Sequence, residues 1–134
     1  MATDLNDNDY AALAEFRFAL RQFQVFSEAK AAEAGLKPQQ HQALLAIRAA
    51  EADDATVGHV ARRLIVKPHT ASELIDRLEA LGFVRREAAH FDRRRALLRL
   101  TPQANDILSA LSSAHREEIR RLQPLLVEQL GQLT

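Results

Sequence analysis

The chain has 134 residues, the length of one ordinary domain, and 47% of them are apolar, enough for one hydrophobic core. It has no cysteine, which excludes disulfides, thiolate metal sites and thiol redox chemistry. It has neither an apolar run of about 18 residues, as a membrane span needs, nor a signal-peptide core, so we expect a cytoplasmic protein without membrane contact.

The formal net charge of zero conceals an uneven distribution of charge. Residues 56–101 contain ten Lys/Arg and five Asp/Glu, a net charge of +5, whereas the rest of the chain has eight Lys/Arg and thirteen Asp/Glu, a net charge of −5. Such a split is typical of a protein with one face suited to a polyanion. Random scatter of surface charge would produce the same totals about as easily.

The first predicted element is a long helix over residues 9–34. Apolar residues recur there at spacings of three and four, namely Leu13, Phe16, Leu20 and Phe23. A second apolar stripe consists of Phe18, Val25 and Phe26. A helix that is apolar on more than one side is expected to have more than one neighbour. Gly35 then supplies the left-handed residue that ends it.

Three shorter helices follow. Pro38 suits the first turn of one helix, whose inward residues are predicted to be Leu44, Leu45 and Ile47. Thr56 can cap the next, with an inward face of Val57, Val60, Ala61 and Leu64. Pro68 opens the third, which has an apolar stripe of Ala71, Leu74, Ile75, Leu78 and Leu81 and ends at Gly82.

The pattern then changes to that of extended chain. FVRREA (83–88) and ALLRLT (96–101) are separated by the charged stretch HFDRRR, which predicts a β-hairpin with a charged tip. Thr101 and Pro102 are typical of a helix start. The helical pattern continues to about residue 122, where we expect Pro124 to interrupt it before a last amphipathic turn.

Two helices, 57–64 and 68–81, separated by three residues form a helix-turn-helix, and the hairpin that follows makes it winged. The predicted fold class is therefore mainly α with a small β-hairpin (α+β): a winged helix-turn-helix domain with additional N- and C-terminal helices.

The sequence resembles the MarR family of bacterial transcription regulators over nearly its whole length. The resemblance rests on TVGHVARRL (56–64), HTASELIDRLEALGFVRR (69–86) and DRRRALLRLT (92–101). It implies one MarR-type domain over residues 1–134, with a DNA-binding lobe over 38–101 and dimerisation helices over 9–34 and 102–134. It also implies a homodimer on palindromic duplex DNA, typically a repressor that a small ligand releases.

The hairpin tip carries the most specific part of the resemblance. In the family pattern an Asp and an Arg are separated by one residue, and five further residues separate that Arg from Leu-Thr; here these residues are Asp92, Arg94, Leu100 and Thr101. Arginine suits the DNA backbone and a narrow minor groove. We expect Asp92 to hold the Arg94 guanidinium in one pose and Arg93 and Arg95 to face phosphates. The alternative is a solvated turn with loose ion pairs.

The helix at 68–81 is the expected recognition helix, because the second helix of such a unit reads the major groove. The residues that we expect to contact DNA are Lys67, His69, Thr70, Ser72, Glu73 and Arg77. Glu73 would repel phosphate unless it is paired, and Arg77 lies four residues further along one helical face. We therefore expect a Glu73–Arg77 ion pair. Ordinary polar helix positions are the alternative for each residue.

In the family, a small effector binds between the dimerisation helices and the DNA-binding lobe. The candidates that this implies here are Arg17, Phe23, Phe26 and His41, facing an anionic or aromatic ligand; the Phe residues can equally be dimer core. No metal or other cofactor is expected, since the five histidines are scattered. Alternative functions are a metal-dependent regulator and a winged-helix protein-interaction module. No phosphate loop or nucleophile motif indicates an enzyme.

Overall fold

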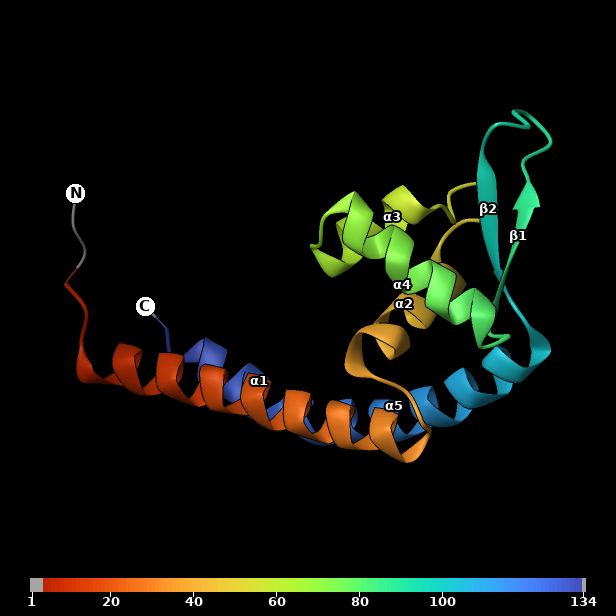
Figure 1. Cartoon of the computed structure of the whole chain (residues 1–134). Coiled ribbons are helices and arrows are strands. Elements are labelled where there is room, and N and C mark those ends of the chain that lie inside the picture. The colour runs from red at the N-terminus through yellow and green to blue at the C-terminus, as the bar shows by residue number, and fades with distance from the viewer. Residues whose placement is uncertain (1–3, 134) are drawn as a thin grey trace. The chain divides into compact units, whose positions relative to one another are not determined.

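A computed structural model of the chain describes residues 4–133. They form two compact units, one of residues up to Lys30 together with those from Ser112 onward, and the other of Ala31–Leu111. Residues 4–133 contain five helices and one two-stranded sheet, in the order α1, α2, α3, α4, β1, β2, α5 (Figure 1). The predicted fold class is confirmed. The single methionine, Met1, lies outside the described residues.

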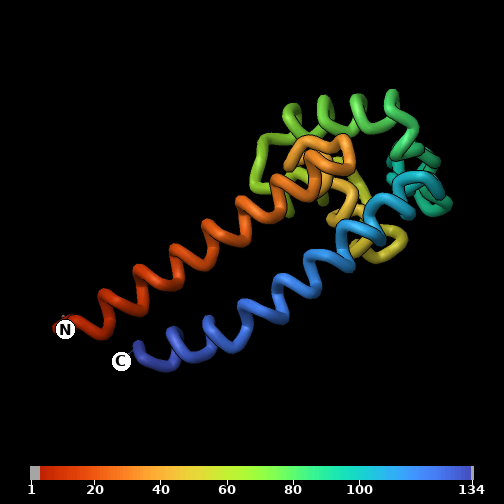
Figure 2. Tube along the Cα trace, turned by 90° about the horizontal axis from the view of Figure 1, so that it is seen from below, coloured from red at the N-terminus to blue at the C-terminus, as the bar shows by residue number. Residues whose placement is uncertain are grey.

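The first unit consists of most of α1 (Asp7–Glu33) and most of α5 (Pro102–Gly131). The two helices run side by side in opposite directions (Figure 2). Asn6 and Asp9 start α1 reciprocally, because each side chain accepts a hydrogen bond from the other residue's backbone N–H, at 2.9 and 3.1 Å. Ser27 on α1 and His115 on α5 share a hydrogen bond of 2.8 Å.

The predicted interruption at Pro124 is wrong, because α5 continues through this residue to Gly131. A proline inside a helix removes one backbone N–H and crowds the carbonyl four residues earlier. Pro124 is exposed, so water can bind that carbonyl, while the apolar side chains of Leu122 and Leu126 continue on either side of it as the inward stripe. None of the helices in residues 4–133 is both long enough and apolar enough to span a membrane.

The second unit has its core between α2 (Pro38–Ala49), α3 (Val57–Leu64), α4 (Pro68–Ala80) and the hairpin. Its largest fully buried side chains include Leu44, Val60, Ile75, Leu78 and Leu98. Two predicted core positions are wrong: Leu45 is 47% exposed and Leu81 52% exposed. Leu45 adjoins Leu44 and so faces another side of α2, whereas Leu81 lies past the last helical residue of α4.

The helix boundaries follow local chemistry. The Thr56 hydroxyl accepts a hydrogen bond from the His59 backbone N–H at 3.1 Å and caps α3. Pro38 and Pro68 each lie at a helix start, where the missing N–H would have no partner in the helix. Lys67 precedes α4 without any side-chain cap. Gly35 and Gly82 follow α1 and α4 with φ of +79° and +81°, as the left-handed C-terminal residue requires.

The hairpin consists of β1 (Val84–Ala88) and β2 (Ala96–Leu100), paired antiparallel with Val84 opposite Leu100. Two strands alone are marginally stable in water. Here the backbone N–H of Leu98 also donates to the carbonyl of Ala55 in the α2–α3 loop at 2.7 Å. Leu97 and Leu98 are both buried, so β2 is fixed to the helical core by its side chains as well.

Thr101 joins the end of the hairpin to α5. Its backbone N–H donates to the Phe83 carbonyl at 3.0 Å, and its hydroxyl donates to the Gly82 carbonyl at 2.7 Å. The same hydroxyl oxygen accepts from the Ala104 N–H at 3.3 Å, which is a helix cap. Thr101 therefore connects the end of α4, the base of the hairpin and the first turn of α5 through its side chain and its backbone N–H together.

Replacing Thr101 should show how much this connection contributes to stability. We expect Thr101→Ala to lower the free energy of unfolding by about 1–2 kcal/mol, since it removes a cap and a hydrogen bond together. Thr101→Ser keeps the hydroxyl and is the matched control, with most of the stability retained. Urea unfolding followed by circular dichroism measures both. Equal losses in the two variants would show that the methyl group, and not the hydroxyl, is what matters.

Candidate nucleic-acid interface

The first turns of α4 present polar side chains outside the core. His69 and Glu73 are exposed, Thr70 and Ser72 are half-buried, and Arg77 is exposed one turn further along. The inward residues Ala71, Leu74, Ile75 and Leu78 are buried, which fixes the rotation of the helix and keeps the polar set outward. Thr70, Glu73 and Arg77 line one shallow groove together with Lys37 and Gln39 of the α2 start.

The predicted Glu73–Arg77 pair is wrong. Glu73 pairs instead with His69, four residues earlier, with 3.2 Å between His69 Nε2 and Glu73 Oε1. Both partners satisfy the i, i+4 spacing, so the spacing alone could not decide between them. Pro68 is the one residue of α4 before His69, and a proline side chain cannot pair with the His69 ring. The Arg77 guanidinium therefore remains exposed and is not engaged by Glu73.

The predicted pair at the hairpin tip is confirmed. One carboxylate oxygen of Asp92 accepts from the Arg94 backbone N–H at 3.0 Å and from Arg94 Nε at 3.2 Å. The side chain of Arg94 is 91% exposed, so its guanidinium is held in place without being buried. The hydrogen bonds from the Arg94 side chain and backbone lower the pKa of Asp92, with a smaller contribution from the charge of Arg95.

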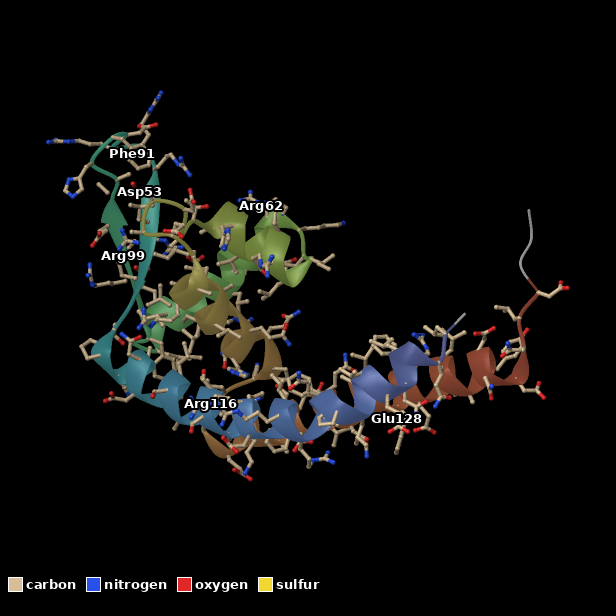
Figure 3. All side chains as sticks on the ribbon, turned by 180° about the vertical axis from the view of Figure 1, so that it is seen from behind. Asp53, Arg62, Phe91, Arg99, Arg116 and Glu128 are labelled. Atoms are coloured by element: carbon tan, nitrogen blue, oxygen red, sulfur yellow. The ribbon has the colours of Figure 1, made fainter. Side chains whose placement is uncertain are left out.

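The other side chains of the tip are arranged around a tight turn. The Arg95 N–H donates to the Asp92 carbonyl at 3.0 Å, and the Ala89 N–H donates to the Arg95 carbonyl at 3.0 Å. The Arg95 guanidinium lies 5.4 Å from the centre of the Phe91 ring, a cation–π contact. Figure 3 shows Phe91 at the tip, and its side chain is 56% exposed. Arg93 is exposed as well.

At the base of the hairpin, Arg86 connects β1 to α4. Its two terminal nitrogens donate to Glu79 at 2.6 Å and to Asp76 at 2.8 Å, and its side chain is only 28% exposed. Asp76 and Glu79 lie three residues apart on one face of α4, so a single planar guanidinium reaches both. The contact engages both acids and offsets one of their two negative charges, which would otherwise repel a phosphate backbone.

On the other side of the hairpin, Arg99 connects β2 to the α2–α3 loop. Its Nη1 donates to the Ala52 carbonyl at 2.7 Å, and its Nε donates to Glu87 at 3.1 Å. Glu87 also accepts from Arg85 at 2.6 Å. Hydrogen bonds first from Arg85 and then from Arg99 hold the pKa of Glu87 below its usual value. Arg99 therefore fixes the hairpin and differs from the exposed cations of the tip.

Sequence reasoning predicted the tip but missed the contacts of Arg86 and Arg99. Both are long-range, since Arg86 and Asp76 are ten residues apart and Arg99 and Ala52 forty-seven. The only signal available was the pairing of Arg86 opposite Leu98 and of Arg85 opposite Arg99 in the hairpin, which becomes known once the register is known. Phe91 was also missed, although an apolar residue in a charged turn is unusual.

The predicted effector residues lie in both units. In the helical pair, the rings of Phe23 and Phe26 meet the ring of His115 edge to face, at 5.8 and 5.4 Å between centres, while Arg17 is exposed. In the other unit, His41 on α2 is 4% exposed. Across residues 4–133, no three His, Asp or Glu side chains converge as a metal site would require.

The pair at the tip makes a prediction about the titration of Asp92. We expect a carboxyl ¹³C titration to give Asp92 a pKa below the reference value of about 3.9. Because the pKa is lowered in the folded state, the interaction stabilises the fold at pH values above the reference pKa. This stabilisation is lost as the pH falls through the pKa of the folded state. Because the Arg94 side chain is the largest cause, Arg94→Ala should raise the pKa. Arg93→Ala is the control, and a matching rise there would contradict the assignment.

The fold is shared with solved winged-helix structures. AbsC from Streptomyces coelicolor, a MarR family transcriptional regulator, is 23% identical with a TM-score of 0.74, over 98% of this chain and 90% of that one. A complex of Staphylococcus aureus MepR with DNA is 21% identical with a TM-score of 0.72, over 96% and 90%. CouR from Rhodococcus jostii RHA1 with bound p-coumaroyl-CoA is 19% identical with a TM-score of 0.69, over 82% and 79%.

No curated protein matches the chain in sequence. A family model does match: residues 34–95 fit that of the MarR family. This segment contains the helix-turn-helix, strand β1 and the hairpin tip with Asp92 and Arg94. Residues 34–95 are thus similar in sequence to the MarR family, and the solved MarR-family regulator AbsC shares the fold.

Proposed function

We propose that the chain is a homodimeric transcription regulator that binds palindromic duplex DNA and represses transcription until a small ligand releases it. The observation that carries the proposal is the Asp92–Arg94 pair, an exposed guanidinium held in one pose at the tip of a hairpin that is fixed to α4. Support also comes from MepR, a winged-helix protein of the same fold whose structure was solved with DNA.

In the proposed complex, α4 enters the major groove. Thr70 and Ser72 can donate to a phosphate or a base edge, and the exposed Arg77 can reach a guanine. Lys67, directly before the helix, would contact a phosphate. His69 and Glu73 bond to one another in the free protein, so Glu73 would come to the groove already paired.

The hairpin tip would enter the adjoining minor groove. A flexible arginine loses side-chain entropy when it is inserted into a groove. Arg94 has already lost part of this side-chain entropy in the free protein, since Asp92 accepts hydrogen bonds from both its backbone N–H and its Nε. Arg93 and Arg95 would contact the phosphates that flank the groove.

The proposed dimer interface uses α1 and α5. Large apolar side chains of this helical pair are exposed in the single chain, including Tyr10, Phe18, Val25, Ile119, Val127 and Leu130. An exposed apolar surface of this extent on a small protein is typical of an oligomer interface. A two-fold axis through such an interface would present two copies of α4 to successive major grooves.

Release by a small aromatic or anionic ligand is supported by CouR, of the same fold, whose structure holds p-coumaroyl-CoA. In the first unit the candidate ligand contacts are Phe23, Phe26 and the exposed Arg17, and in the second unit the candidate is His41. Candidate aromatic acids can be added to DNA-binding assays, where an effector weakens binding of the wild-type protein.

Substitutions at the hairpin tip test DNA binding directly. On a duplex selected from random DNA by the wild-type protein, we expect Arg94→Ala to lose more affinity than Arg93→Ala or Arg95→Ala, by about 1–3 kcal/mol per contact. The other two should mainly reduce the salt dependence, by about one unit of slope for each phosphate that is no longer neutralised. Asp92→Ala should resemble a milder Arg94→Ala. Tighter binding by Asp92→Ala, or equal losses for the three arginines, contradicts the role of the pair.

The dimer is tested by a charge placed on the exposed apolar face. Leu130→Asp should weaken dimerisation by at least about tenfold, because a carboxylate would be buried at the interface without a partner. Gln123→Asp introduces the same charge at an exposed polar position of α5 and is the matched control. Sedimentation equilibrium measures both. A wild-type monomer at micromolar concentration, or equal effects of the two substitutions, would refute this interface.

A further inference from the structure

The turn between α3 and α4 contains an isoleucine in an unfavourable conformation. Ile65 has φ of 56° and ψ of 51°, and it is the one non-glycine residue with positive φ in residues 4–133. The left-handed region places Cβ close to the following carbonyl oxygen, and β-branched residues occur there least of all. Glycine would adopt this conformation without that cost.

The conformation itself is required by the way α3 ends. The Val66 N–H donates to the Ala61 carbonyl at 3.0 Å and the Ile65 N–H to the Arg62 carbonyl at 3.3 Å, which together are the usual left-handed termination of a helix. The backbone therefore needs a left-handed residue at position 65. It does not need an isoleucine, and any side chain there makes the turn less favourable.

Packing does not account for the side chain either. Ile65 is 90% exposed, the most exposed of the large apolar residues described, whereas the next residue, Val66, packs against the core. An exposed, strained isoleucine contributes nothing to the stability of the free protein. Such strain is commonly kept where the side chain has a role in binding.

The surroundings of Ile65 indicate what it binds. Exposed cations flank it: Arg62 and Arg63 in the last turn of α3, and Lys67 directly before α4. Figure 3 shows Arg62 on this helix. A single apolar side chain among cations is too small a patch for a protein partner. It fits duplex DNA, where phosphates lie beside base edges and the thymine methyl is the one apolar group on those edges in the major groove.

We propose that Ile65 is a specificity residue that contacts a thymine methyl group at the edge of the major groove where α4 enters. This inference rests on the proposed DNA binding. Only two residues separate Ile65 from Pro68, the first residue of α4, so a protein that places the first turn of α4 against base edges also brings Ile65 to the groove. The left-handed conformation directs the side chain away from the core.

The test replaces both sides of the contact. A duplex selected by the wild-type protein is resynthesised with deoxyuridine for thymine, which removes only the methyl group, at one position at a time. At one position in each half-site the wild-type affinity should fall about fourfold, the value expected for one buried methyl group. Ile65→Gly should bind the thymine duplex about fourfold more weakly for each half-site and be insensitive to deoxyuridine there.

Two controls separate a direct contact from an effect on folding. Ile65→Gly should also raise the melting temperature, by about 2–4 °C, because glycine relieves the strained turn, so weaker binding cannot come from unfolding. Leu81→Ala removes an apolar side chain that is also exposed, at 52%, at the far end of α4, and should keep both the affinity and the deoxyuridine effect.

The outcomes are distinct. If the wild-type protein binds the selected duplex but no deoxyuridine position matters, or if Ile65→Gly keeps the wild-type affinity and sensitivity, the thymine contact is overturned and DNA binding stands. Failure of the wild-type protein to select any duplex overturns both proposals.

Discussion

The hairpin of this protein is stable only because it is anchored to the helices around it, and the proposed interface depends on that anchoring. Two strands have too little core of their own. β2 is held by the Leu98–Ala55 backbone hydrogen bond and by Arg99 on the Ala52 carbonyl, and β1 is held by Arg86 on α4. The tip and α4 are therefore parts of one rigid piece within the second unit. The distance between them is already set before DNA binds.

The same contacts explain how a chain without net charge can carry a basic surface. Three acids near the hairpin, Asp76, Glu79 and Glu87, are each bonded to an arginine of β1 or β2. Asp92 is bonded to Arg94 and serves to orient it. Exposed arginines lie at the tip, on α4 and in the last turn of α3. The acids therefore neutralise the base of the hairpin and leave positive charge where a phosphate backbone would lie.

Sequence reasoning predicted the elements and the tip because both depend on local patterns. Capping residues and prolines are recognised within one helical turn of sequence, and the Asp92-to-Thr101 spacing within ten residues. It failed where several local solutions were equivalent, as in the choice of Glu73 between His69 and Arg77, or where context overrode propensity, as at Pro124. It could not predict Arg86 or the conformation of Ile65, because these follow from tertiary contacts and from helix geometry that only the folded chain defines.

The central claim is that α4 and the hairpin tip bind one duplex at the same time, in different grooves. Dimethyl sulfate footprinting tests it most directly, since the reagent methylates guanine N7 in the major groove and adenine N3 in the minor groove. On the selected duplex the account predicts guanine protection within each half-site and adenine protection beside it, with the adenine protection lost in Arg94→Ala. Guanine protection without any adenine protection by the wild-type protein, or no protection in either groove, would contradict it.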